Sequence, residues 1–111
     1  MDEKIKKVIE NHIENNEVCL FMKGTPDAPQ CGFSMAVSNI LKILKVNYKS
    51  VNVLEDQSIR EGIKVYSDWP TIPQLYIKKE FVGGCDIIKE MYESGELKKV
   101  FQDKGINHKK D

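Results

Sequence analysis

The chain is organised around the stretch Lys23-Gly24-Thr25-Pro26-Asp27-Ala28-Pro29-Gln30-Cys31-Gly32-Phe33-Ser34. An apolar run over residues 18–22 precedes it, and apolar residues at helical spacing follow it as far as Leu44. The sequence therefore predicts that Cys31 lies where a loop leaving a strand enters a helix. Unpaired amides and the helix dipole favour negative charge there, and Lys23 can return as a second positive charge. Because the thiolate is favoured in such surroundings, we expect Cys31 to have a lowered pKa.

The alternative interpretation of Cys31 is a buried cysteine that packs as a small hydrophobe, the commoner fate of a lone cysteine. Its neighbours Pro29, Gln30 and Gly32 suit an exposed turn better than a core. Cys19, by contrast, lies inside the apolar run, and we expect it to pack in the core. The candidate reactive thiol is therefore Cys31.

The composition indicates one domain, residues 1–111, with lysine plus arginine equal to aspartate plus glutamate at 17 each. No overall charge attracts nucleic acid or an anionic membrane. The longest apolar run is about five residues, whereas a membrane-spanning helix needs about 20. Three cysteines are an odd number and favour a reducing compartment over a disulfide framework. With no secretory signal pattern at the start, we expect a cytoplasmic protein, and a mature form in an organelle matrix stays open.

Periodicity predicts the order α-β-α-β-α-β-β-α-α, a mixed sheet with helices on both faces. The expected helices include residues 2–15 and 32–45 and a third capped by Asp56 or Ser58. A strand over 18–23 is expected to pair in parallel with a short one near Val51, and 74–77 with 81–83 as a hairpin. Asp86 is expected to cap the following helix, Gly95 to end it, and residues 104–111 to form a flexible polar tail.

Two further segments suggest a site. Trp69-Pro70-Thr71-Ile72-Pro73 brings two prolines to the start of a strand. A cis bond before Pro73 would leave the carbonyl and amide of Ile72 free to face a ligand. Gly83-Gly84-Cys85-Asp86 has two glycines, which allow backbone to approach backbone or ligand closely.

These segments, with Lys23-Gly24 and Cys31-Gly32-Phe33-Ser34, closely resemble the monothiol, CGFS-type glutaredoxins. The resemblance covers about residues 3 to 103, and the length is similar to that of the short single-domain bacterial and organellar members. It implies a thioredoxin-like α/β fold, with a four-stranded mixed sheet flanked by about five helices.

The resemblance also implies a glutathione site. Lys23 and Arg60 would bind the carboxylate at the glycine end, and Ile72 would pair main chain to main chain with the tripeptide. Cys85 and Asp86 would hold the γ-glutamyl end. Without the resemblance, the two cations are explained as solvated surface charges and Asp86 as a helix cap.

A bridging [2Fe–2S] cluster is implied as well, with Cys31 as the metal ligand and glutathione supplying a second thiolate. Two protomers and two glutathiones would complete it as a homodimer, and a BolA-type partner could replace one protomer. His12 and His108 are interpreted as surface residues and not as ligands. The implied role is delivery of the cluster to apo iron–sulfur proteins.

Ser34 stands where dithiol relatives have a second cysteine, so an oxidised Cys31 must be resolved by glutathione or by Cys85. This favours the carrier, with at most weak enzyme activity. The alternative is a glutathione-dependent thiol–disulfide oxidoreductase that removes glutathione from mixed disulfides with Cys31 alone. A longer loop over 25–30 than in dithiol relatives also favours the carrier, since it could tilt glutathione away from attack. A redox-inert interaction module would leave Cys31 and its cations unexplained.

Overall fold

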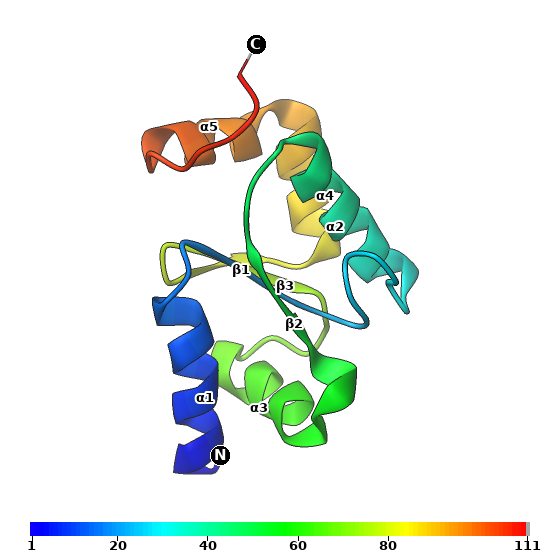
Figure 1. Cartoon of the computed structure of the whole chain (residues 1–111), viewed down its shortest axis with the longest axis vertical. Coiled ribbons are helices and arrows are strands. Elements are labelled where there is room, and N and C mark those ends of the chain that lie inside the picture. Colours follow the sequence, from blue (N-terminus) through cyan, green and yellow to red (C-terminus); the bar gives the residue numbers. More distant parts are fainter. Residues whose placement is uncertain (111) are drawn as a thin grey trace.

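The elements follow the predicted order. The structure, a computed structural model, describes residues 1–110. Its elements are α1 (Glu3–Glu14), β1 (Val18–Met22), α2 (Gly32–Ile43), β2 (Lys49–Asn52), the short 3₁₀ turn η1 (Val53–Glu55), α3 (Gln57–Ser67), β3 (Gln74–Ile77), β4 (Glu80–Gly83), α4 (Cys85–Ser94) and α5 (Glu96–Asp103) (Figure 1). Only η1 was not expected, and it occupies the turn between β2 and α3.

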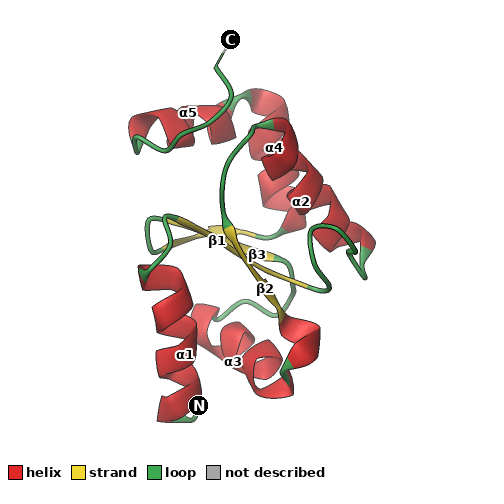
Figure 2. Cartoon of the chain, in the orientation of Figure 1, coloured by secondary structure: helices red, strands yellow, loops and turns green. Residues whose placement is uncertain are grey.

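The four strands form one mixed sheet in the order β2-β1-β3-β4, as Figure 2 shows in yellow. β1 pairs in parallel with β2, as the crossover through α2 predicts. β1 and β3 are antiparallel, and β3 and β4 form the expected hairpin. This topology places the end of β1 and the start of β3 side by side, with Phe21 opposite Gln74.

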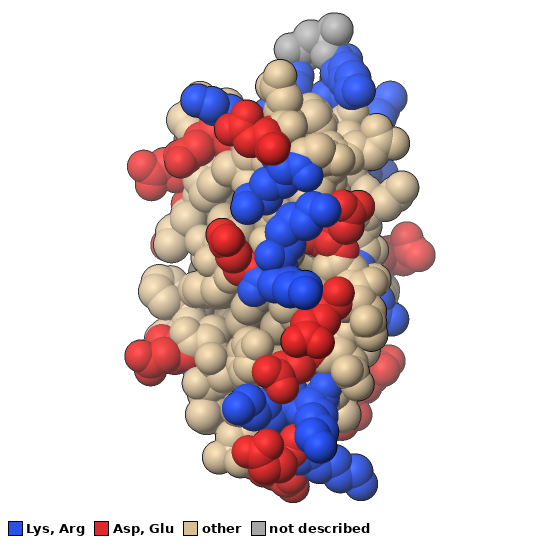
Figure 3. Space-filling model, turned by 90° about the vertical axis from the view of Figure 1, so that its left-hand side faces the viewer, with Lys and Arg blue, Asp and Glu red and all other residues tan. Residues whose placement is uncertain are grey.

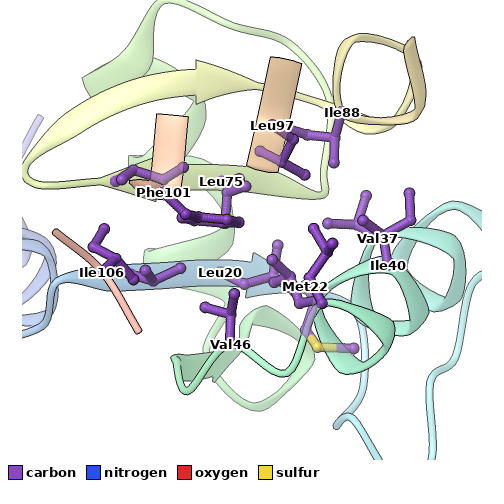
Figure 4. Close-up of a cluster of buried hydrophobic side chains, with 14 residues drawn as sticks. Leu20, Met22, Val37, Ile40, Val46, Leu75, Ile88, Leu97, Phe101 and Ile106 are labelled. Carbon is purple, nitrogen blue, oxygen red and sulfur yellow. The ribbon is translucent and has the colours of Figure 1, made fainter. Parts of the chain in front are cut away.

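Helices cover both faces of this sheet: α1 and α3 lie on one side, and α2, α4 and α5 on the other (Figure 1). Successive side chains of β1 point to opposite faces of the sheet. Leu20 and Met22 join the core beneath α2, α4 and α5 (Figure 4), whereas Cys19 and Phe21 join the core beneath α1 and α3. Cys19 is completely buried, as expected, and burial raises its pKa to about 12. These findings confirm the thioredoxin-like fold.

Of the two predicted N-cap positions at α3 and α4, the first is confirmed and the second is wrong. Asp56 is the N-cap of α3, where its carboxylate accepts the amides of Ser58 and Ile59. Asp86 is not a cap: α4 begins at Cys85, its N-cap is Gly84, and no side chain caps it. Asp86 is instead inside the first turn, where a negative charge still suits the helix dipole.

The segment after α5 lies against the domain. Ile106 is only 5% exposed and belongs to the core beneath α5 (Figure 4). The Lys109 amide donates to the Leu44 carbonyl at the end of α2, at 2.6 Å. The predicted polar tail therefore contacts the domain at Ile106 and Lys109, while its flexibility stays a prediction and Asp111 lies outside the described residues.

Charges of both signs are interspersed over the face in Figure 3, as the equal totals of 17 suggest. This face has no broad patch of one sign. Within residues 1–110, no helix is both long enough and apolar enough to span a bilayer.

Candidate functional site

Cys31 is the N-cap of α2, the position predicted for it. Its backbone is extended, with φ −157° and ψ 136°, and its carbonyl accepts the amide of Met35 at 2.9 Å. The side chain is half-buried, so it is neither sealed in the core nor fully solvated. The thiol therefore sits at the end of the helix where amides are free to donate.

Several neighbours lower the pKa of Cys31. The largest effect is a hydrogen bond from the backbone of Ser34, which outweighs the opposing effect of burial. The Phe33 amide, the charge of Lys23 and the Ser34 hydroxyl add to it in that order. The thiolate is therefore stabilised mainly by helix amides and secondly by Lys23.

Ser34 links two elements of the site. It is completely buried, and its Oγ accepts the backbone amide of Lys23 at 3.0 Å. Since that oxygen accepts from Lys23, its proton is available to the thiolate of Cys31. One side chain thus ties the end of β1 to the first turn of α2.

The loop between Lys23 and Cys31 is folded back on itself. The Gln30 amide donates to the Lys23 carbonyl at 2.9 Å, and the Gly24 amide donates to Asn52 Oδ1 at 3.0 Å. Gly24 has φ +91°, and a Cβ there would lie 2.5 Å from the Ala28 carbonyl, so the turn needs glycine. Sequence reasoning missed Asn52, because 28 residues separate it from its partner.

A pocket of about 340 Å³ lies between the start of α2, the segment before β3 and the start of α4. Its lining residues are Phe33, Trp69, Thr71, Ile72, Pro73, Gly84, Cys85, Asp86 and Ile87. Three predicted glutathione-binding residues are among them: Ile72, Cys85 and Asp86. The peptide bond before Pro73 is cis, as hypothesised. A larger cavity of about 590 Å³ lies near His108, but no cysteine lines it.

Lys23 and Arg60 do not line this pocket. Arg60 Nε is nevertheless buried and has no hydrogen-bond partner among the described residues. A buried donor without a partner is unfavourable, and buried donors in proteins are nearly always paired. A hydrogen-bond acceptor, such as a carboxylate, would satisfy this donor.

Gly84 and Cys85 form the opposite wall. A Cβ on Gly84 would lie 3.2 Å from Trp69 Nε1 and 3.3 Å from the Pro73 carbonyl. The segment over residues 69–73 therefore packs closely against the backbone of Gly84. Burial raises the pKa of Cys85, the charge of Asp86 adds to that rise, Lys89 opposes it, and the charge of Cys31 adds a smaller rise. Cys85 therefore keeps its proton at a pH where Cys31 has lost its own.

Comparison with known proteins decides the family. The glutaredoxin family model matches residues 18–82. A probable monothiol glutaredoxin 2 of Rickettsia typhi is 55% identical over 103 residues, which cover 93% of each chain. The chain belongs to the monothiol glutaredoxins. The mitochondrial monothiol glutaredoxin-5 of Lachancea kluyveri is 54% identical, and the match covers 88% of this chain and 71% of the relative.

Solved structures agree with this assignment. The solution structure of a monomeric truncated mutant of Trypanosoma brucei 1-C-Grx1 superposes with a TM-score of 0.88 at 46% identity. The match covers 96% of each chain. The thioredoxin-like fold of this monothiol glutaredoxin is thus shared over nearly its whole length.

No three His, Cys, Asp or Glu side chains lie together as a metal site within residues 1–110 of this monothiol glutaredoxin. The two histidines are not the plain surface residues we expected. Both are half-buried, with ring centroids 6.4 Å from Phe21 for His12 and 6.4 Å from Phe101 for His108. Among the described residues, Cys31 is therefore not part of such a cluster.

Proposed function

We propose that this monothiol glutaredoxin carries a [2Fe–2S] cluster, bound by Cys31 and by glutathione, and delivers it to apo iron–sulfur proteins. One observation carries the proposal: Cys31 is a half-buried thiol of lowered pKa with Ser34, not a cysteine, three residues later. Thiolates are the usual ligands of such clusters. A thiolate without a partner at position 34 cannot be lost to a disulfide there.

Glutathione fits the groups around the pocket. We assign its glycine carboxylate to Lys23 and Arg60, since the buried Arg60 Nε has no partner among the described residues. Its main chain would pair with Ile72, which precedes the cis bond and lines the pocket. Its γ-glutamyl end would meet Cys85 and Asp86 at the start of α4, where free amides favour a carboxylate and Asp86 faces the amine.

Two chains complete the cluster in this proposal. Four ligands are needed, and one chain with one glutathione supplies two of them, so cluster binding and dimerisation become one event. Two exposed apolar side chains that line the pocket suit contact with a second protein: Phe33 and Ile87, which are 63% and 37% exposed. Met35, also in the first turns of α2, is 48% exposed. A BolA-type protein could take the place of one protomer.

A reducing compartment suits this chemistry. All three cysteines are free, and Cys31 must stay reduced to bind iron. We therefore place the protein in the cytoplasm or in an organelle matrix.

The lowered pKa of Cys31 also favours a second function, glutathione-dependent thiol–disulfide exchange. The thiolate would attack the glutathione sulfur of a mixed disulfide and release the substrate as its thiolate. A second glutathione would then free Cys31 and leave as glutathione disulfide. The loop over residues 24–30, fixed by Asn52 and by its own hydrogen bonds, supports the carrier if it tilts glutathione out of line for this attack.

Anaerobic reconstitution tests the proposal. With iron, sulfide and glutathione, the protein should become red-brown and elute as a dimer. Cys31→Ser should stay colourless and monomeric, whereas Cys19→Ser, which changes a buried core thiol, should keep the colour. A colourless wild-type monomer, or colour that persists in Cys31→Ser, would contradict the proposal. High turnover of a glutathione mixed disulfide by the same sample would instead favour the enzyme.

A further inference from the structure

Gln74 is a buried amide at an unusual place. It is the first residue of β3, it is completely buried, and it lies opposite Phe21 of β1. The other residues of β3 are apolar or aromatic. Since a buried amide is unfavourable unless its hydrogen bonds are made, the partners of Gln74 indicate why it is there.

Every polar atom of the Gln74 side chain has a partner. Nε2 donates to the Trp69 carbonyl at 3.2 Å and to the Thr71 carbonyl at 3.1 Å. Oε1 accepts the hydroxyl of Tyr76 at 3.2 Å. Two carbonyls on one side and a hydroxyl donor on the other allow only one orientation of the amide.

The two carbonyls belong to the segment that forms one wall of the pocket. At its other end, the Trp69 amide donates to the Lys64 carbonyl at 3.1 Å and to Ser67 Oγ at 3.2 Å. The segment is thus held by α3 where it begins and by Gln74 up to the residue before Ile72. Trp69, Thr71, Ile72 and Pro73 all line the pocket.

We propose that Gln74 is a positioning residue for glutathione: its amide fixes residues 69–73 in the shape that Ile72 presents to the tripeptide. This inference rests on the proposed function, because it concerns the same site. Gln74 does not line the pocket and acts only through the carbonyls of Trp69 and Thr71. Without this amide the segment keeps its bonds to α3 but loses the two at Trp69 and Thr71, and ordering this part of the segment becomes a cost of binding.

Titration calorimetry with reduced glutathione tests this on four proteins of the whole 111-residue chain: the wild type and three variants. Gln74→Met keeps the length of the side chain but removes both donors, and it should bind about tenfold more weakly, which equals about 1.4 kcal/mol. Tyr76→Phe keeps both carbonyl bonds of Gln74 and removes the hydroxyl, which orients the amide and also hydrogen-bonds Ser67, so glutathione affinity should fall about threefold. Ser38→Ala breaks the 3.2 Å bond between Ser38 and Tyr48, neither of which lines the pocket. This variant should bind glutathione like wild type.

A second measurement separates positioning from general stability. Trp69 is the chain's one tryptophan, so its fluorescence reports the segment directly. Its emission without ligand should shift in Gln74→Met and not in Ser38→Ala, when both are measured well below their melting temperatures.

The outcomes separate this inference from the function on which it rests. Wild-type affinity in a folded Gln74→Met would overturn the inference and leave the glutathione site intact. No binding by the wild type would overturn both. If Gln74→Met does not fold, Tyr76→Phe against Ser38→Ala decides: a threefold difference supports the inference, and equal affinities overturn it.

Discussion

Replacement of Arg60 by methionine should weaken glutathione binding and, without glutathione, stabilise the protein. Arg60 Nε is buried and unpaired among the described residues, so without glutathione the protein has an unsatisfied hydrogen-bond donor at Arg60, which is unfavourable. Methionine keeps an apolar stem of similar length and removes that donor. The two effects have opposite signs, which a general loss of structure does not produce.

The size of each effect follows from the hydrogen bond that Arg60 lacks. A hydrogen bond to a charged group contributes about 1.5–3 kcal/mol, so glutathione affinity should fall roughly 10- to 150-fold. Nε is the one polar atom of this half-buried side chain found both buried and unpaired among the described residues, so the stabilisation is smaller, at most about 1 kcal/mol. That corresponds to a melting temperature about 4 °C higher without ligand.

Calorimetric titration and thermal unfolding measure the two effects on the same sample. Lys64→Met is the matched control, because it removes one positive charge from the next turn of α3. Lys64 Nζ lies 3.8 Å from Glu61 at the surface. The affinity of the Lys64→Met protein for glutathione should stay within about twofold of wild type. An Arg60→Met protein that binds glutathione normally, or that is less stable than wild type without it, would refute the reasoning.

Two further predictions concern packing and thiol chemistry. Gly62→Ala should destabilise the protein by about 1 kcal/mol, because overpacking of about 1–3 kcal/mol exceeds a helix-propensity gain of about 1 kcal/mol. Its Cβ would lie 2.8 Å from a methyl group of Ile5, whereas Gly32→Ala, with nothing within 4 Å, should lose no stability in the same urea titration. Alkylation by iodoacetamide should begin at lower pH at Cys31 than at Cys85, since one pKa is lowered and the other raised. Because the pKa of Cys31 is lower in the folded state, its contribution to stability is lost as pH falls through that value. The reverse order of alkylation in a peptide map, or equal losses for the two glycines, would contradict these predictions.

Local signals explain which elements the sequence revealed. The apolar run ending at Met22 and the helical spacing after Cys31 placed the thiol correctly, because strand and helix periods are local properties. Asp86 misled us for the same reason: an acidic residue before an apolar stripe looks like a cap, and the glycines before it do not show that the helix starts earlier.

Several contacts that hold the site together could not be predicted from the sequence. Asn52 holds Gly24 across 28 residues, and an asparagine at a strand end has many other uses. Gln74 gave no signal, because its Nε2 donates to backbone carbonyls, which every residue has. Ile106 looked like part of a polar tail because its sequence neighbours are polar, yet its side chain belongs to the core beneath α5 and its amide donates to the Phe101 carbonyl.

The central claim is that Cys31 and glutathione together hold the cluster between two chains. Native mass spectrometry of the anaerobically reconstituted protein tests it most directly, because it weighs the whole assembly. The account predicts one species containing two chains, one [2Fe–2S] cluster and two glutathiones, which Cys31→Ser does not form. A cluster-bearing species without glutathione, or a single chain that holds the whole cluster, would contradict it.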